Sequence, residues 1–105
     1  MPTLLIVYHS MTGGTESMVQ ACANAARSEP ELNIEIKHAS NTTSADVLKA
    51  NGYIFATPEY LGSMSGLMKD FFDRTYYDVI DQIQGRPYAT MVCAGSDGQG
   101  AVRQI

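Results

Sequence analysis

The chain has 105 residues, which is enough for one small domain, and residues 1–105 are treated as that domain. Hydrophobic residues make up 45% of the chain and charged residues 17%, an ordinary balance for a folded globular protein. With 7 Lys and Arg against 11 Asp and Glu, the net charge is −4. This balance argues against a surface that binds nucleic acid or anionic membranes, because both need basic patches.

The composition shows no sign of export or membrane insertion. The first apolar run, residues 4–7, is too short for the core of a signal peptide, and no stretch approaches the roughly 20 apolar residues of a membrane span. Cys22 and Cys93 stand alone in apolar surroundings without CxxC spacing. We expect them to be buried, reduced thiols of a cytoplasmic protein.

The first unit of the chain is a strand followed by a helix. Residues 3–8 form a continuous apolar run, which is typical of a parallel strand covered on both faces. From residue 15 to about residue 27 the pattern is helical, and Pro30 ends it. The expected inner positions of this helix are Met18, Val19, Cys22, Ala25 and Ala26.

The second unit repeats this order. Residues 34–37 alternate between isoleucine and charged residues, which predicts a half-buried strand at the edge of a sheet. Residues 44–50 fit a short helix, and residues 53–57 a strongly apolar strand closed by Pro58. The expected inner residues of the short helix are Ala45, Val47 and Leu48.

The third unit begins at Ser65, a suitable N-cap for a helix over residues 66–76. Residues 85–87 form a turn signal, and residues 88–94 have the composition of a buried strand. The expected inner face of the helix consists of Leu67, Met68, Phe71, Phe72 and Thr75.

This alternation of strands and helices predicts an α/β fold with a doubly wound parallel sheet. Such sheets bind ligands beyond the carboxyl ends of their strands. The loops after the first, third and fourth strands hold unusual residues, whereas residues 38–43 after the second do not. The last strand is apolar and needs a neighbouring element to cover it, and residues 101–105 start another helical pattern. We therefore expect that the chain is truncated after the fourth strand or is completed by a partner.

The first of these loops, residues 10–15, is an anion cradle by composition. Its hydroxyls at Ser10, Thr12 and Thr15 and the free N–H groups of the following helix can bind an anion. It has neither the lysine of a nucleotide-binding P-loop nor GxGxxG spacing. Such a loop suits one dianionic phosphomonoester, as in FMN, although a capped helix start is the simpler alternative.

Two further loops complete a candidate site. Residues 57–66 contain Pro58, the aromatic Tyr60 and glycines that would let the backbone approach a flat ligand. Residues 95–100 are glycine-rich and contain Asp97, which could form a turn or contact the ligand. The three loops together suit a phosphorylated planar heterocycle.

Three segments, HSMTGGTESM, TPEYLGSMSGLMKDFFDR and CAGSDGQG, resemble the flavodoxin-like superfamily. More narrowly, they resemble its branch of NAD(P)H-dependent FMN reductases and quinone reductases, which includes tryptophan-repressor-binding-protein-like enzymes. The resemblance covers the whole chain and implies a flavodoxin-like fold. It also implies an FMN site made of Ser10, Met11, Thr12, Gly13, Gly14 and Thr15 at the phosphate, Pro58, Glu59, Tyr60, Leu61, Gly62, Ser63 and Met64 along the isoalloxazine, and Gly95, Ser96, Asp97 and Gly100 at the far rim.

The resemblance further implies an activity. NAD(P)H would give a hydride to flavin N5, and the electrons would pass to a quinone or a similar acceptor. No catalytic side chain is required, and the enzyme would be a homo-oligomer. The alternatives are a flavodoxin-type electron carrier and a binding or regulatory module without turnover.

Other polar residues receive structural interpretations. His9 is expected to pack or form hydrogen bonds, and His38 to end a strand; their separation in sequence gives no metal-ligand spacing. The charged residues of the third helix are expected to form a solvated face, namely Lys69, Asp70, Asp73 and Arg74.

Overall fold

The computed structural model describes residues 2–9, 14–60, 63–79, 82–83 and 85–93. Four parallel strands form one sheet, as predicted, and the structure places them in the order β2–β1–β3–β5. Their bounds are β1 Thr3–Tyr8, β2 Asn33–His38, β3 Gly52–Tyr60 and β5 Tyr88–Cys93. A short antiparallel strand, β4 (Ser63–Met64), pairs with the end of β3.

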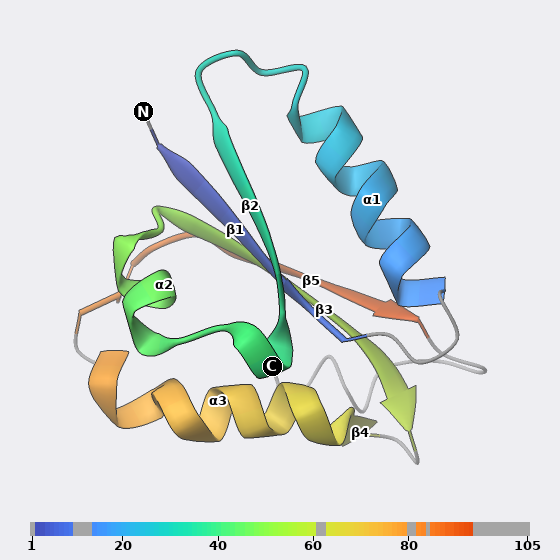
Figure 1. The fold of residues 1–105 in the computed structure, drawn as a ribbon, viewed down its shortest axis with the longest axis vertical. Coiled ribbons are helices and arrows are strands. Elements are labelled where there is room, and N and C mark those ends of the chain that lie inside the picture. Colours follow the sequence, from blue (N-terminus) through green and yellow to red (C-terminus); the bar gives the residue numbers. More distant parts are fainter. Residues whose placement is uncertain (1, 10–13, 61–62, 80–81, 84, 94–105) are drawn as a thin grey trace.

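Helices cover both faces of this sheet (Figure 1). Helix α1 (Gly14–Ala26) packs on one face, and α2 (Ser44–Lys49) and α3 (Gly66–Val79) pack on the other. Among the described residues, no helix is both long and apolar enough to cross a lipid bilayer.

The β1 strand divides the hydrophobic core. Leu5 and Val7 point to the α2 and α3 side, while Ile6 points to the α1 side, and all three are fully buried. This alternation follows from the two-residue period of a strand. The continuous apolar run is therefore explained by a strand that is covered on both faces, as the sequence predicted.

Helix α1 lies in the predicted place but is rotated by about one position. Its fully buried residues are Val19 and Ala23, which pack with Ile6 and Ala56. Ala25, expected inside, is exposed, and Cys22 is half-buried. Because apolar residues flank this helix face on both sides, composition alone could not distinguish the two rotations.

Helix α2 turns a carboxylate inward where an alanine was expected. Asp46 is buried and Ala45 is exposed. Thr43 is the N-cap: its backbone N–H donates to Asp46 Oδ2 at 2.9 Å, and its Oγ1 accepts from the Asp46 N–H at 3.4 Å. Lys37 Nζ lies 3.0 Å from Asp46 Oδ1. The capping box and the ion pair hold the Asp46 side of the helix inward. Neither interaction can be recognised from the hydrophobic pattern of the sequence.

Pro58 does not end β3, contrary to the prediction. The strand continues through Tyr60, and Pro58 pairs in register with Cys93 of β5. The carbonyl of Ala56 accepts the His9 N–H at 3.2 Å, so residues 56 and 58 direct their backbone polar groups toward β1. Because β1 ends at Tyr8, proline at 58 removes no donor from the β1 ladder.

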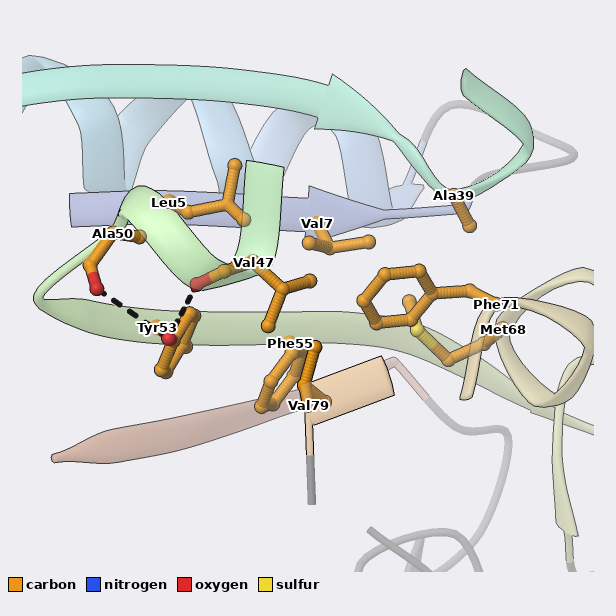
Figure 2. Close-up of a cluster of buried hydrophobic side chains, with 10 residues drawn as sticks. All are labelled: Leu5, Val7, Ala39, Val47, Ala50, Tyr53, Phe55, Met68, Phe71 and Val79. Carbon is orange, nitrogen blue, oxygen red and sulfur yellow. Dashed lines mark hydrogen bonds between the residues drawn. The ribbon is translucent and has the colours of Figure 1, made fainter. Parts of the chain in front are cut away.

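Helix α3 begins where predicted, since Ser65 Oγ accepts the Met68 N–H at 3.3 Å. Leu67, expected inside, is 40% exposed. The buried face instead continues to the end of the helix, and Figure 2 shows how Phe71 and Met68 meet Val7 of β1. The buried residues of this face are Met68, Phe71, Thr75 and Val79.

The loops around the α2 and α3 core are fixed by polar contacts to backbone carbonyls. The Tyr53 hydroxyl donates to the Val47 carbonyl at 2.6 Å, as Figure 2 shows. Arg86 Nη1 donates to the Leu48 and Ala50 carbonyls, both at 2.8 Å. Arg86 follows Gly85, whose φ of +84° confirms the predicted turn and favours glycine there.

Strand β5 is more exposed than its apolar composition predicted. Tyr88 is 63% exposed and Ala89 is exposed, while residues 90–92 are half-buried. Within the described part of the chain, β5 pairs only with β3. The apolar sequence of β5 indicates that this strand can be buried, but burial also requires another element to pack against it.

The loop after β2, which looked unremarkable in the sequence, is tightly held. It forms a 3₁₀ turn, η1 (Ala39–Asn41). Arg74 of α3 donates from Nη2 to the Ala39 carbonyl at 2.7 Å and from Nη1 to the Thr42 carbonyl at 2.9 Å. Its Nε also meets Asp70 Oδ2 at 2.7 Å. Arg74 is therefore a clamp between two elements as well as part of a solvated face.

Replacing Arg74 by alanine is expected to lower the free energy of unfolding by about 1–3 kcal/mol, because two carbonyls lose a charged donor. Arg74→Lys should recover only part of this loss, since one ammonium cannot reproduce the planar fork. Lys69→Ala is the matched control. In the described part of the chain, the Lys69 side chain forms an exposed ion pair with Asp73, so its loss should cost less than about 1 kcal/mol. If urea unfolding showed equal losses of unfolding free energy for Arg74→Ala and Lys69→Ala, the role of Arg74 as a clamp would be contradicted.

Candidate functional site

The carboxyl ends of β1, β3 and β5 meet at one edge of the sheet, and α1 begins at that edge (Figure 1). The first turn of α1 therefore presents its free N–H groups there. Parallel sheets commonly bind ligands in this position. The first element of the predicted anion site, a strand leading into a helix N-terminus, has the expected topology.

The predicted cradle is described only in its last part. Gly14 is the first residue of α1, and Thr15 in its first turn is 2% exposed. The remaining predicted cradle residues lie outside the described residues: Ser10, Met11, Thr12 and Gly13. Their assignment to a phosphate stays a prediction.

The second predicted loop is largely a β-hairpin. Glu59 pairs with Met64, and Tyr60 pairs with Ser63, so β3 and β4 extend past the end of β1. Two residues, Leu61 and Gly62, connect the paired strands and lie outside the described residues. A two-residue connection containing glycine is a hairpin signal in the sequence.

The hairpin is anchored in the core at its base. Pro58 and Thr57 are buried, and Thr57 Oγ1 accepts the Ser65 N–H at 3.0 Å. Met64 is half-buried and packs against the α2 and α3 core. This anchoring places the backbone of residues 59–60 and 63–64 beside the carboxyl edge of the sheet.

The third predicted loop lies outside the described residues, including Gly95, Ser96, Asp97 and Gly100. The last described residue before it is Cys93, which pairs with Pro58 at the end of β5. The chain therefore leaves β5 at the same edge as the other two loops. The contacts of these four residues stay a prediction.

The structure brings together two histidines that the sequence left separate. His38 ends β2 and lies in register with Tyr8, so it is a strand-end residue as expected. Its ring packs edge-on against His9, with ring centroids 5.6 Å apart, and against Tyr8 at 5.4 Å. Pairing of β1 with β2 creates this contact. The sequence signal was only that each histidine ends a predicted strand.

His9 is a buried imidazole without a hydrogen bond at one nitrogen. Its side chain is 8% exposed, and Nδ1 finds no partner among the described residues. Burial lowers the pKa of His9, and the neighbouring His38 lowers it further. Both effects favour the neutral form of the ring.

His38 is oriented by the η1 turn. Its Nδ1 accepts the Ser40 N–H at 3.2 Å and lies 2.8 Å from Ser40 Oγ. A nitrogen that accepts a backbone N–H carries no proton, so neutral His38 has its proton on Nε2. The Arg74 clamp on Ala39 fixes the same turn from the other side.

The described part of this edge contains the start of a helix and no cluster of metal-ligating side chains. The buried Thr15 lies in the first turn of α1 at this edge, and the free N–H groups of a helix N-terminus favour anions in general. Within residues 2–9, 14–60, 63–79, 82–83 and 85–93, no group of three or more His, Cys, Asp or Glu could hold a metal ion. Glu16, the acidic residue in the first turn of α1, is exposed.

The family comparison agrees with this geometry. The sequence model of the NADPH-dependent FMN reductase family matches residues 15–105. A flavodoxin of Aquifex aeolicus (strain VF5) is 33% identical over 100 residues, which cover 95% of this chain and 54% of that protein. A quinone-dependent NAD(P)H dehydrogenase of Acidithiobacillus ferrooxidans (strain ATCC 53993 / BNL-5-31) is 32% identical over 95 residues, covering 71% of this chain and 48% of that protein. The chain thus spans about half the length of these relatives.

Solved structures show the same fold. The Fusobacterium nucleatum flavodoxin bound to flavin mononucleotide has a TM-score of 0.80 at 15% identity, covering 98% of this chain and 61% of that one. A WrbA-like flavodoxin from Agrobacterium tumefaciens has a TM-score of 0.72 at 23% identity, covering 95% and 64%. The fold is flavodoxin-like.

The lowered pKa of the buried His9 predicts how stability depends on pH. Because its pKa is lowered in the folded protein, the unfolded chain binds the proton more readily. Stability should be full above the ordinary histidine pKa of about 6.5 and fall as the pH drops below it, by at most about 1.4 kcal/mol per pH unit for one site. His9→Gln should flatten this slope in urea unfolding between pH 7.5 and 5. Parallel wild-type and variant curves would contradict the prediction.

Proposed function

This chain belongs to the NADPH-dependent FMN reductase family, and we propose that it binds FMN and passes electrons from NAD(P)H to a quinone or a similar acceptor. One observation carries the proposal. Strand β1 leads into the N-terminus of α1 at the edge where β3 and β5 also end, which is the position of a phosphate site in a doubly wound sheet. The quinone-dependent relative supports this class of acceptor.

The phosphate of FMN would bind at the start of α1. Gly14 and Thr15 would contribute backbone N–H groups of the first helical turn, and the Thr15 hydroxyl would add a donor. The preceding residues of the cradle would complete the donor set with hydroxyls and backbone N–H groups: Ser10, Met11, Thr12 and Gly13. No lysine is needed, because the N-terminus of the helix already favours a dianion.

The isoalloxazine would lie along the β3–β4 hairpin. The anchored backbone of Glu59, Tyr60, Ser63 and Met64 would form one wall, completed by Pro58, Leu61 and Gly62. Gly95, Ser96, Asp97 and Gly100 would form the far rim. Carboxylates at Glu59 and Asp97 would disfavour negative charge on the reduced ring, whereas backbone N–H groups would favour it.

The bound FMN would supply the redox chemistry, taking a hydride from NAD(P)H and releasing electrons to the acceptor. The chain itself binds and orients the ring, and none of its side chains is required as a nucleophile or general base. The same fold could serve a flavodoxin-type electron carrier, an alternative supported by the flavodoxin relative of Aquifex aeolicus. Carriers often have a denser acidic rim than a net charge of −4 provides, which favours the reductase.

The direct test is turnover with purified protein and added FMN. The proposed reductase should bleach bound flavin with NAD(P)H under anaerobic conditions, and a quinone should restore the absorbance. Flavin that binds but is reduced only by dithionite would indicate the electron carrier instead. Protein that takes up no FMN would overturn both flavin functions and favour a binding or regulatory module.

Thr15→Ala and Thr12→Ala are each expected to weaken FMN binding by about 1–3 kcal/mol through loss of a charge-assisted hydrogen bond. Riboflavin, which has no phosphate, should bind the wild type and the variants equally. Ser28→Ala is a suitable control because Ser28 follows the C-terminal end of α1, where its hydroxyl donates to the Ala25 carbonyl at 2.7 Å. Titration of flavin fluorescence measures these affinities. Unchanged FMN affinity in both threonine variants would contradict the phosphate assignment.

A further inference from the structure

The base of the β3–β4 hairpin contains a buried hydroxyl group with a defined partner on each side. Thr57 is fully buried. Its Oγ1 donates to the Pro58 carbonyl at 2.9 Å and accepts the Ser65 N–H at 3.0 Å. A hydroxyl has one donor hydrogen and two acceptor lone pairs, so it can bind both partners at once. Thr57 therefore connects the strand that enters the hairpin to the residue that follows it.

Both partners of the Thr57 hydroxyl are backbone groups in places where they need one. The described ladder between β1 and β3 ends with Tyr8 opposite Ala56, so the Pro58 carbonyl lies past the end of β1. Ser65 is fully buried, and its N–H lies between the end of β4 and the start of α3. Buried backbone groups are costly to leave without a hydrogen bond. Removal of the hydroxyl would deprive both groups of this partner.

The hairpin is a short ribbon that needs an anchor. Its described pairs are Glu59 with Met64 and Tyr60 with Ser63. A two-stranded ribbon is marginally stable on its own in water. Met64 packs against the α2 and α3 core, but apolar packing is non-directional and does not by itself fix the spacing of two backbones. The hydrogen bonds of Thr57 are directional, and they set that spacing at the base of the hairpin.

The anchor point on the far side of the hairpin is itself fixed. Ser65 Oγ accepts the Met68 N–H at 3.3 Å, and the Ser65 carbonyl accepts the Lys69 N–H at 3.0 Å. Met68 is fully buried in the α2 and α3 core. Ser65 is therefore held by the first turn of α3, and Thr57 ties the hairpin to that turn.

We propose that the Thr57 hydroxyl positions the backbone of the β3–β4 hairpin to receive the ring system of the flavin. This inference rests on the proposed function, which places the isoalloxazine along the same hairpin. Thr57 is a positioning residue, because it acts through the backbone groups of Pro58 and Ser65. Without the hydroxyl, the hairpin would spend part of its time in open arrangements. The apparent affinity for the ring falls in proportion to the fraction of molecules that remain competent to bind it.

The first experiment compares flavin affinities after Thr57→Val, which removes the hydroxyl and keeps a β-branched side chain. We expect riboflavin and FMN to bind more weakly by the same factor, about tenfold, which corresponds to about 1.4 kcal/mol and to the net value of one hydrogen bond. Riboflavin has the ring but no phosphate, so an equal loss locates the effect at the ring. Thr57→Ser keeps the hydroxyl and should restore both affinities. Titration of flavin fluorescence measures them.

Thr75→Val is the matched control. Thr75 is a buried threonine in the second half of α3, and its hydroxyl donates to the Phe71 carbonyl at 2.9 Å. Its replacement should lower stability and leave the riboflavin affinity unchanged. A loss of global stability does not alter affinity while the protein stays folded, because only the fraction that cannot bind lowers it. An equal loss of riboflavin affinity in both valine variants would overturn the proposal.

The second experiment follows amide hydrogen exchange by NMR in the chain without flavin. Thr57→Val should accelerate exchange in residues 59–65 about tenfold and leave the amides of β1 unchanged, since the loosening is local. Thr75→Val should leave residues 59–65 unchanged. The wild-type chain provides a test even if Thr57→Val does not fold. Its Ser65 amide should be strongly protected, and exchange as fast as that of a solvent-exposed amide would overturn the proposal.

The two experiments separate this proposal from the proposed function. If the hairpin of Thr57→Val exchanges faster but riboflavin affinity does not change, the positioning role is overturned and the flavin function stands. If the wild-type chain binds no flavin, the proposed function fails. Hydrogen exchange then decides whether Thr57 fixes the hairpin: acceleration confined to residues 59–65 supports this role, and a uniform or absent change overturns it.

Discussion

The burial of β1 on both faces is the constraint on which the rest of the structure depends. Leu5 and Val7 supply one core and Ile6 the other, so a strand of six residues holds α1 to one face and α2 and α3 to the opposite face. The parallel partners β2 and β3 flank β1 in register. A parallel sheet aligns its carboxyl ends, and this alignment makes one edge of the molecule a place where loops from distant parts of the chain converge.

The second requirement of the fold is that the backbone carbonyls in its loops have hydrogen-bond donors. Tight turns leave carbonyls that neither helix nor sheet satisfies, and buried polar groups need partners. Two arginines meet this need: Arg74 for η1 and Arg86 for the end of α2. Each guanidinium binds two carbonyls that are more than 30 residues away in sequence. The sheet is therefore held at both ends by directional hydrogen bonds as well as by apolar packing, through η1 after β2 and through the end of α2 before β3.

The candidate site was predictable in outline because it depends on chain order. A strand, a loop of small hydroxyl residues and a helix must place a helix N-terminus beside the strand end, as Thr15 confirms by its position in the first turn of α1. The β3–β4 hairpin and the pairing of His9 with His38 were missed. Pro58 suggested an end to β3 because proline has no backbone N–H to donate to a neighbouring strand. This missing donor matters only where the neighbouring strand continues, and the position of that neighbour is decided by the sheet. The histidine contact requires the register between β1 and β2, which neither strand encodes alone.

The sequence by itself determined the order and type of the main elements, since hydrophobic periods of two and 3.6 residues and caps such as Ser65 are local properties. The tertiary structure decided the details of burial that the hydrophobic pattern left open. Asp46 turns inward and Ala45 outward because Lys37 and Thr43 hold the carboxylate. Leu67 stays exposed while Phe71 fills the core. The physical reason is the same in each case: burial and hydrogen bonding depend on partners that only the folded chain brings within reach.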